Sequence, residues 1–362
     1  MHSSSRRAFL SQSSLVAGAA LAFPHIATAS KTGGPIILGE GDHQYEVIHN
    51  WAILPDQFSW QVTHNVAVDS EQNLYVMHEG DPSRKDHPAI FVFDPKGRFI
   101  RAFGSQFQGG GHGIEVHQEG DQQFLYVTGY QQVKSIAKLT LNGEIVWYQR
   151  APMASGRYDK GEDIATKADW GRKKFLPTNI AFHPSDGSFY VADGYGAHCI
   201  HRYDAAGNYL STIGKPGKME GEFNLPHGLG IDSRGGKAPT LCVADRANGR
   251  LQWFDLDGKH LKTLNDPFIL PANIDVQGDL MLIPDLAARI TLMDKDDKII
   301  HLGNDDEWRS HVTANNNQLR TEPQRWLDGK FVHPHDACFD AQGNIFVAEW
   351  VATGRITKLR KV

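Results

Sequence analysis

Residues 334–350 read PHDACFDAQGNIFVAEW, and this stretch decides the fold. It opens on a proline and a histidine, continues as a short apolar run, turns at Asp-Ala-Gln-Gly and continues as a second apolar run. Short apolar runs joined by turns of Asp, Asn and Gly are typical of antiparallel β-hairpins. The stretch therefore predicts two paired strands entered through a polar turn.

The opening of this unit occurs six times in the chain. The six openings are THNVAVDS (63–70), GHGIEVHQ (111–118), PTNIAFHP (177–184), PHGLGIDS (226–233), PANIDVQG (271–278) and PHDACFDA (334–341). Their second residues are His64, His112, Thr178, His227, Ala272 and His335, at intervals of 48, 66, 49, 45 and 63 residues. Each interval holds about four short strands, and this pattern predicts an all-β, six-bladed β-propeller. We expect residues 42–55 to supply a strand that closes the ring with the last blade.

The composition excludes some classes of partner. The 362 residues are 40% apolar and 22% charged, which is ordinary for a globular protein. The formal net charge is −5 and no basic block occurs, which argues against nucleic acid or anionic lipid as the main partner. The three cysteines, Cys199, Cys242 and Cys338, cannot form a complete disulfide framework because their number is odd. We expect a monomer that binds a small molecule or a peptide.

Residues 1–29 have the layout of a secretory signal. Arg6 and Arg7 precede a weakly apolar run, which is too short to span a bilayer and ends in a small-x-small sequence at Ala29. The paired arginines resemble a bacterial twin-arginine signal. We therefore expect cleavage near Ala29, export to the periplasm or the cell exterior, and no stable membrane insertion.

The sequence divides into three predicted segments. Residues 1–29 are the signal, residues 30–43 are a linker, and residues 44–362 are the propeller. The whole folded part is expected to be one domain, since the repeats run through it without a break.

Histidines at three of the six equivalent positions indicate a metal site. His112, His227 and His335 fall on the second, fourth and sixth units, and alternate blades of a six-bladed ring are related by a roughly threefold rotation. The three imidazoles should therefore converge on the propeller axis. Three neutral nitrogen donors with an open fourth position are typical of a catalytic zinc site. A single histidine at such a position more often bonds a neighbouring turn, so the prediction depends on all three together.

Two further residues have open roles. His64, on the first unit, is a candidate fourth ligand, an orienting partner of a ligand, or a substrate-binding residue at the rim. Asp336 should point away from His335, into the channel, because neighbouring side chains on a strand face opposite sides. There it is either a calcium ligand or a carboxylate that caps a turn.

The repeats resemble NHL repeats, and residues 44–362 resemble the lyase domain of the peptide-amidating enzymes, peptidyl-α-hydroxyglycine α-amidating lyase. The similarity is densest in LPTNIAFHPSDGSFYVADGYG (176–196), LCVADRANGRLQWF (241–254) and VHPHDACFDAQGNIFVAE (332–349). NHL repeats alone say little about function. The three histidines together with ADGY and ADRANGR are more specific.

The resemblance implies a six-bladed propeller with a zinc ion (Zn²⁺) at its mouth and a structural calcium ion (Ca²⁺) on its axis. The implied zinc ligands are His112, His227 and His335. The implied calcium ligands are the carboxylate of Asp336 and backbone carbonyls near Val66 and Ile114.

The resemblance also implies a reaction. The substrate would be a carbinolamide, a peptide that ends in α-hydroxyglycine, and cleavage of its C–N bond would release an amide and glyoxylate. Tyr195 of DGYG matches the active-site tyrosine, a plausible base for the hydroxyl proton. Arg246 of ADRANGR matches an active-site arginine, which would hold the substrate carboxylate. Each also has a purely structural interpretation, Tyr195 as a packed loop aromatic and Arg246 as an ion-pair partner of Asp245.

The chain departs from the family at the substrate contacts. Glu79 stands where the family has an arginine, and a glutamate would repel a substrate carboxylate. Arg84 or Lys85, in the same loop, is a candidate replacement. His333 stands where the vertebrate enzyme has a methionine and is expected to contact substrate. The cysteines do not reproduce the family's disulfides.

Two other functions remain open on the sequence. One is a propeller that binds a peptide, glycan or protein at its mouth without catalysis, with Trp60, Trp147 and Trp170 as candidate contact residues. The other is a different propeller enzyme, such as a calcium-dependent lactonase or a glycan lyase, which would need a carboxylate-rich mouth.

Overall fold

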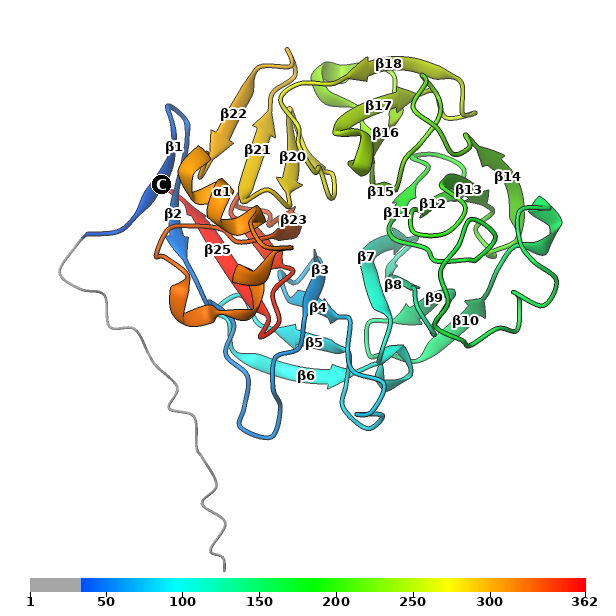
Figure 1. The fold of residues 1–362 in the computed structure, drawn as a ribbon, viewed down its shortest axis with the longest axis horizontal. Coiled ribbons are helices and arrows are strands. Elements are labelled where there is room, and N and C mark those ends of the chain that lie inside the picture. Colours follow the sequence, from blue (N-terminus) through cyan, green and yellow to red (C-terminus); the bar gives the residue numbers. More distant parts are fainter. Residues whose placement is uncertain (1–33) are drawn as a thin grey trace, which may run out of the picture. The chain divides into compact units, whose positions relative to one another are not determined.

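The computed structural model describes residues 34–362, and these form six antiparallel β-sheets arranged in a ring around a channel (Figure 1). Each sheet is one blade, and its first strand lies next to the channel. The predicted six-bladed, all-β propeller is therefore confirmed. The predicted signal, residues 1–29, lies outside the described residues.

Five blades are built from four consecutive strands each. Blade 1 contains β3 (Thr63–Val68), β4 (Leu74–His78), β5 (Ile90–Phe93) and β6 (Phe99–Phe103). Blade 2 contains β7 (Gly111–Glu119), β8 (Gln122–Gly129), β9 (Ser135–Thr140) and β10 (Ile145–Gln149). Blade 3 contains β11 (Ile180–Phe182), β12 (Phe189–Asp193), β13 (Cys199–Tyr203) and β14 (Tyr209–Ile213). Blade 4 contains β15 (Pro226–Asp232), β16 (Thr240–Asp245), β17 (Arg250–Phe254) and β18 (His260–Leu264). Blade 5 contains β19 (Asp275–Gln277), β20 (Leu280–Asp285), β21 (Arg289–Met293) and β22 (Ile299–Leu302).

Blade 6 joins the two ends of the described chain. It contains β23 (Pro334–Phe339), β24 (Ile345–Glu349) and β25 (Arg355–Lys361), and its outer strands are β2 (His43–Ile48) and β1 (Ile37–Glu40). The predicted closing strand is thus present, since β2 pairs antiparallel with β25. Within the part of the expected linker that the structure describes, β1 pairs with β2 and extends the sheet.

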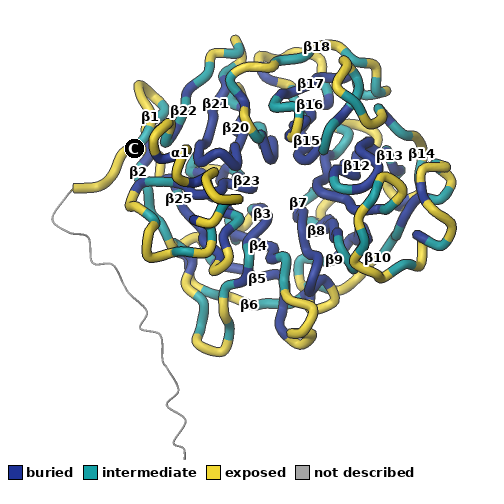
Figure 2. Tube along the Cα trace, viewed as in Figure 1, coloured by how far each residue is buried: buried dark blue, intermediate teal, exposed yellow. Residues whose placement is uncertain are grey.

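The core lies between neighbouring blades. The second and third strands of a blade are covered on both faces, so they are continuous apolar runs rather than alternating ones, as in β4 and β5. The outer strands, such as β6 and β14, carry exposed residues at the rim (Figure 2). The three cysteines are unpaired.

Glycines allow the inner strands to approach one another closely. A Cβ atom on Gly113 would lie 2.5 Å from the Thr178 carbonyl oxygen, and one on Gly228 would lie 2.3 Å from the Asn273 Cα. Both glycines directly follow a histidine of the predicted ring. Glycine therefore follows the histidine in blades 2 and 4 because the backbone of the next blade leaves no room for a side chain.

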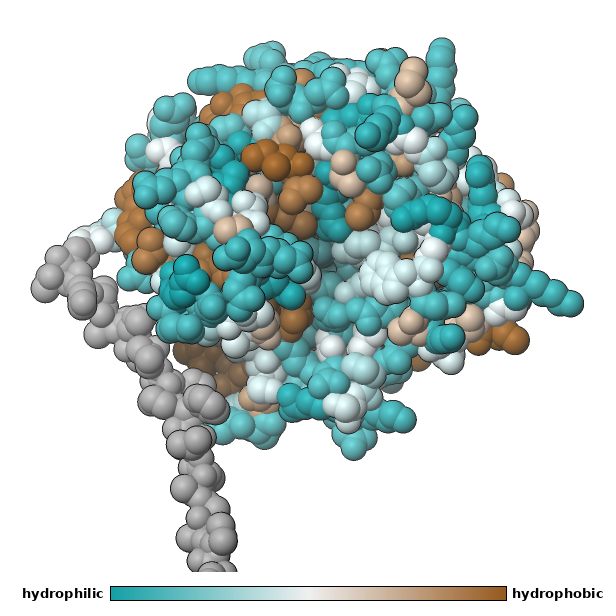
Figure 3. Space-filling view, viewed as in Figure 1, coloured by the Kyte–Doolittle hydropathy of each residue, from teal (hydrophilic) through white to brown (hydrophobic). Residues whose placement is uncertain are grey.

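The mouth is the end of the channel where the inner strands begin. Two kinds of segment meet there, because antiparallel strands place every second connection at the same end. The mouth loops, which join the second and third strands of each blade, are residues 79–89, 130–134, 194–198, 246–249, 286–288 and 350–354. The segments between blades also lie at this end, and in Figure 3 the face is hollowed at the centre of the ring.

Helical structure in the described residues is confined to short segments. The single α-helix described, α1 (Asp306–Thr313), lies between blades 5 and 6 (Figure 1). The 3₁₀ helices are Ser105–Phe107, Met153–Ser155, Arg234–Gly236, Arg246–Asn248, Gln318–Thr321 and Pro323–Arg325. None of the described helices has the length and apolar character needed to cross a membrane.

Candidate metal centre

The three predicted histidine ligands meet at the mouth of the channel. The ring centroids of His112, His227 and His335 are 4.7–4.9 Å apart, so they form a nearly equilateral triangle. The Nε2 atoms of His112 and His227 are 3.2 Å apart. All three residues are at most 2% exposed.

Hydrogen bonds to the backbone fix how these rings point. The Nδ1 atoms of His112, His227 and His335 lie 2.7, 2.5 and 2.8 Å from the carbonyl oxygens of the next blade's ring residue. These acceptors are Thr178, Ala272 and His64. Because a carbonyl oxygen only accepts, each Nδ1 carries the proton and each Nε2 keeps its lone pair. Such a bond on the distal nitrogen is how metal-binding histidines are commonly oriented.

Burial keeps the three imidazoles neutral. Loss of solvation, together with the charge of nearby histidines and of Arg246, holds the pKa of each ring well below its ordinary value. Neutral imidazoles are the form that binds a metal ion. Two nitrogens on a tetrahedral zinc ion, each about 2.0–2.1 Å from it, are roughly 3.3 Å apart, which matches the His112–His227 separation. The residues therefore fit a zinc ion.

His64 belongs to the same cluster. Its ring centroid is 4.8 Å from that of His112 and 4.6 Å from that of His335. Ligand nitrogens of His64, His112 and His335 all lie within 4.8 Å of one another. Unlike the other three, its ring nitrogens make no hydrogen bond of good geometry within the described part of the chain. This placement makes it a candidate fourth ligand as well as a candidate substrate contact.

Glu79 lies beside His64. Its Oε2 atom is 3.4 Å from His64 Nε2, and its Oε1 atom accepts a 2.6 Å hydrogen bond from Gln131 Nε2. Burial alone would raise the pKa of this carboxyl, but the polar groups of His64, Tyr130 and Gln131 outweigh it and leave the pKa below its ordinary value. An ionised carboxylate therefore occupies the position where the resemblance predicts an arginine.

Tyr195 and Arg246 come together on the opposite side of the histidines. The Tyr195 hydroxyl is 3.3 Å from His112 Nε2 and 3.1 Å from His227 Nε2. Arg246 Nη2 donates to the same hydroxyl oxygen at 3.1 Å. Both residues are on mouth loops, on blades 3 and 4, which explains why residues 51 positions apart meet. One oxygen thus faces two ligand nitrogens and a guanidinium.

Two aromatic residues extend the site outward. Tyr130, on the mouth loop of blade 2, has its ring centroid 5.2 Å from that of His112 and 5.1 Å from that of Tyr195. Trp170 packs against Tyr130 and Tyr195 and is 57% exposed. The sequence analysis missed Tyr130, although TGY in blade 2 resembles the DGY of blade 3. Of the other candidate tryptophans, Trp60 and Trp147 pack against core clusters.

The two remaining predicted substrate contacts, His333 and Arg84, lie in different surroundings. His333 is buried, its Nδ1 lies 2.7 Å from the Leu286 carbonyl oxygen, and its ring packs against Trp350. Arg84 Nη1 instead donates to Ser59 Oγ at 2.7 Å in an exposed loop, and none of its described contacts is with the histidines. The suggested replacement of the missing arginine by Arg84 is therefore not supported by its position.

Arg320 is the cation that the sequence analysis did not find. It lies in the segment between blades 5 and 6, its guanidinium carbon is 3.4 Å from the centroid of the Trp350 ring, and Glu79 and Tyr130 act on its pKa. Burial is the largest influence and lowers that pKa. A segment far from Glu79 in sequence thus places a positive charge near it, which no local pattern could have indicated.

Asp336 lies on the inner side of the histidines. It is fully buried, its Oδ2 accepts a 2.7 Å hydrogen bond from Val66 N–H, and its Oδ1 accepts from Asn273 Nδ2. Burial raises its pKa to about 7. The buried carboxyl of Glu115 is close enough for its pKa to be raised well above the ordinary value by burial and by Asp336. Asn273 Oδ1 is buried and has no hydrogen-bond donor within residues 34–362. These oxygens fit a calcium ion, because a carboxylate can accept more bonds than the two seen on Asp336.

The chain is similar to amidating lyases over part of its length. It is 27% identical to mouse peptidyl-glycine alpha-amidating monooxygenase over an alignment of 248 residues that covers 60% of this chain and 23% of the mouse protein. It is 28% identical to a probable peptidyl-alpha-hydroxyglycine alpha-amidating lyase of Caenorhabditis elegans over 172 residues, 47% of this chain and 43% of that protein. It is 27% identical to human NHL repeat-containing protein 3 over 231 residues, 62% of this chain and 60% of that protein. No family model matches the chain.

Solved structures share the fold at low sequence identity. A streptogramin B lyase superposes with a TM-score of 0.55 at 13% identity, covering 89% of this chain and 99% of that one. A gluconolactonase from Xanthomonas campestris superposes with a TM-score of 0.57 at 12% identity, covering 91% and 96%. These likenesses concern the propeller fold alone.

Proposed function

We propose that this protein is a zinc-dependent lyase that cleaves the C–N bond of a carbinolamide, such as a peptide ending in α-hydroxyglycine. The observation that carries the proposal is the Tyr195 hydroxyl, which lies 3.1–3.3 Å from two histidine Nε2 atoms and from Arg246 Nη2. The similarity to amidating lyases supports the same reaction.

The reaction needs a base, an anchor for the substrate and a Lewis acid. His112, His227 and His335, with His64 as a possible fourth ligand, would hold a zinc ion, which supplies Lewis acidity toward the substrate hydroxyl. Tyr195 takes the hydroxyl proton, and Arg246 stabilises negative charge on the phenol oxygen. The electrons of the O–H bond form the aldehyde of glyoxylate, the C–N bond breaks, and the proton passes to the amide nitrogen.

Charge at the mouth orients the substrate. Arg246 lies on the Tyr195 side of the histidines, and the ionised Glu79 lies on the His64 side. A substrate carboxylate is attracted to the first and repelled by the second. The carboxylate therefore points toward Arg246, which places the carbinol hydroxyl between that arginine and the histidines.

Metal content and glyoxylate release test the proposal together. Elemental analysis of the wild type should give near-stoichiometric zinc, which the His112→Ala/His227→Ala variant should lack. The exposed His311→Ala is the matched control and should keep it. Tyr195→Phe should retain zinc but lose glyoxylate release by at least about 100-fold, as expected for a general base. A folded wild-type protein without zinc, or a fully active Tyr195→Phe, would contradict the proposal.

We also propose a structural calcium ion at Asp336. Support comes from the buried carboxyl of Asp336, the nearby carboxyl of Glu115, and Asn273 Oδ1, which has no donor among the described residues. Calcium should raise the unfolding midpoint of the metal-depleted protein, since a ligand of the folded state stabilises it. Asp336→Asn should abolish that rise. A midpoint independent of calcium in the wild type would exclude the site.

A binding role without catalysis is the second candidate. Trp170, with more than half of its surface exposed at the rim of the mouth, is the observation that favours it, since exposed aromatics often mark contact sites. Such a propeller would bind a peptide or glycan at the mouth whether or not zinc is present. Equal binding by zinc-loaded and zinc-free protein, without glyoxylate release, would favour this role.

Export is a separate proposal that rests on residues 1–29 alone. The mature protein should begin near Ser30. Replacing Arg6 and Arg7 by lysine should retain the protein in the cytoplasm of a bacterial host with a twin-arginine system, and unchanged export of that variant would contradict the proposal.

A further inference from the structure

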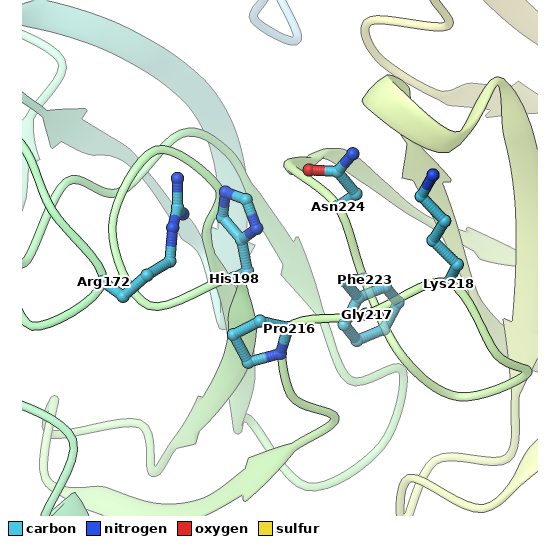
Figure 4. A pocket seen from close by; sticks show the side chains of 7 residues that line it. All are labelled: Arg172, His198, Pro216, Gly217, Lys218, Phe223 and Asn224. Atoms are coloured by element: carbon cyan, nitrogen blue, oxygen red, sulfur yellow. The ribbon is translucent and has the colours of Figure 1, made fainter.

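A cationic pocket lies beside the mouth, between blades 3 and 4. It has a volume of about 350 Å³, and its polar lining residues are Arg172, His198, Lys218 and Asn224. Phe223 and Pro216 form apolar parts of its wall. In Figure 4 the polar ends of the four side chains extend to the same side of the pocket. The lining is thus two cations, one imidazole and one amide, with no carboxylate.

Neither cation forms an ion pair within residues 34–362, although Asp193 partly offsets the lowering of the Arg172 pKa by burial. Among the described residues, no carboxylate oxygen lies within ion-pairing distance of the Arg172 guanidinium or the Lys218 ammonium. Arg172 Nη1 donates only to the Gly196 carbonyl oxygen, at 2.6 Å. Glu222 is close by, but it accepts from backbone N–H groups and pairs with Lys215. Unpaired positive charges in a concave site attract anions.

His198 adds an unsatisfied polar atom to the pocket. The residue is only 6% exposed, yet its Nε2 has no hydrogen-bond partner in the described chain. Its backbone adopts a left-handed conformation, with φ of 53°, which is uncommon for a residue other than glycine. Burial and Arg172 lower its pKa to about 4, and an anion bound beside it would favour the protonated, hydrogen-bond-donating form. A buried imidazole with a free nitrogen therefore faces the same space as the two cations.

Two short connections link the lining of the pocket to the loops of the proposed active site. Gly196, which binds Arg172, directly follows Tyr195 in the chain. Asn224 accepts a 3.0 Å hydrogen bond through its carbonyl from Ala247 N–H, next to Arg246. The lining of the pocket is therefore attached to the two loops that carry Tyr195 and Arg246.

We propose that the pocket binds a carboxylate on the part of the substrate that projects from the mouth, such as an acidic side chain preceding the terminal α-hydroxyglycine. The identity of the substrate rests on the function proposed above. The preference for a negatively charged group rests on the side chains that line the pocket. It makes Arg172 and Lys218 specificity-determining residues, which act on substrate choice and not on the bond that breaks.

Substrate competition tests the preference. Acetylated tripeptides ending in α-hydroxyglycine, with Glu or Gln at either preceding position, are compared by kcat/KM for glyoxylate release. The wild type should prefer Glu at one of these positions by about tenfold, the size expected for one or two partly exposed ion pairs. Lys218→Glu should remove or reverse this preference and leave the rate with Gln unchanged. The absence of any preference at both positions in the wild type would overturn the proposal.

A matched control separates local from overall charge. Lys259 is also exposed, and it lies on the turn between β17 and β18, at the opposite end of the strands. Lys259→Glu changes the net charge by the same amount and should keep the wild-type preference. An equal loss of preference in Lys218→Glu and Lys259→Glu would show a long-range effect and overturn the proposal.

Binding of an anion without catalysis separates this proposal from the lyase proposal. Inorganic phosphate is titrated into the whole protein while the His198 imidazole resonance is followed by NMR. A saturable shift in the wild type that is lost in Arg172→Met/Lys218→Met supports the pocket even if no glyoxylate is ever released. If the protein releases glyoxylate but shows neither a Glu preference nor a phosphate-dependent shift, the lyase proposal is supported and the anion-pocket proposal is overturned.

Discussion

Blades 3 and 4 hold their mouth loops in place in two different ways. Each has a fully buried aspartate at the end of its second strand, Asp193 in β12 and Asp245 in β16. Each aspartate precedes a residue of the proposed active site, Tyr195 or Arg246, by one or two positions. The two carboxylates are therefore equivalent in place, but their partners differ.

Blade 4 anchors its aspartate from within. Asp245 pairs across the strands with Arg250, whose Nε donates to Asp245 Oδ2 at 2.7 Å. Blades 5 and 6 repeat the arrangement with Asp285–Arg289 and Glu349–Arg355. The loop is thus fixed by strands of its own sheet.

In blade 3 the side chain that bonds the buried aspartate comes from the inserted segment between blades 2 and 3. The position equivalent to Arg250 is Cys199, and Asp193 instead accepts from Tyr158 Oη at 2.7 Å and from two backbone N–H groups. Tyr158 belongs to the long segment between blades 2 and 3 that also carries Trp170 and Arg172. The difference teaches that the position of Tyr195 is coupled to that segment, whereas the position of Arg246 is independent of it.

The largest effect is expected from breaking the blade 4 anchor. Arg250→Met leaves a buried carboxylate without its partner, which should lower the free energy of unfolding by about 3–5 kcal/mol. Urea unfolding measures this loss. Arg98→Met, which breaks an exposed pair with Asp94, is the control and should cost less than about 1 kcal/mol. Equal losses in the two variants would contradict an internal anchor in blade 4.

A smaller effect is expected from breaking the blade 3 anchor. Tyr158→Phe removes one donor to Asp193 and should lower the free energy of unfolding by about 1–3 kcal/mol. Because Tyr195 follows Asp193 closely, the variant should also lose glyoxylate release while keeping zinc. Tyr209→Phe, whose hydroxyl bonds Thr212 on an outer strand, is the control and should keep full activity. Unchanged activity in Tyr158→Phe would show that Tyr195 is independent of the insertion.

The smallest effect is the pH dependence of the blade 3 anchor. Burial raises the pKa of Asp193 to about 6, above its value in the unfolded chain, so the folded state holds this proton more tightly. The associated stability is fully present below the unfolded pKa and is lost as the pH rises through 6. Between pH 6 and 7.5 the loss should be roughly 0.4 kcal/mol, measured by urea unfolding as the wild type minus Asp193→Asn. A difference that grows with pH would contradict the sign.

The repeat pattern predicted the fold because it reflects local chemistry. Each opening combines a turn, a ring residue and a short apolar run, and these repeat wherever an inner strand begins. The histidine cluster followed from the same register, since equivalent positions on a ring must face a common axis. The structure brings His112, His227 and His335 together, and it adds His64.

The contacts between segments could not be predicted from local patterns. Arg320 approaches Glu79 from a segment more than 200 positions away in the numbering, and Tyr158 replaces an arginine that blade 3 lacks. Arg84 was the nearest cation to Glu79 in sequence, but its loop turns it toward Ser59. Such pairings depend on how long connections fold over the mouth, and neither periodicity nor turn chemistry specifies that.

The closure of blade 6 sets an order of events for assembly. His335 Nδ1 bonds the carbonyl oxygen of His64, 271 positions earlier, and β2 reaches the ring only by pairing with β25. Contacts this distant in sequence form slowly, because a long stretch of chain must be gathered first. The histidine cluster is therefore among the last features to form during biosynthesis, and a ribosome-bound chain that stops before β25 would carry the histidines without the geometry of the complete ring.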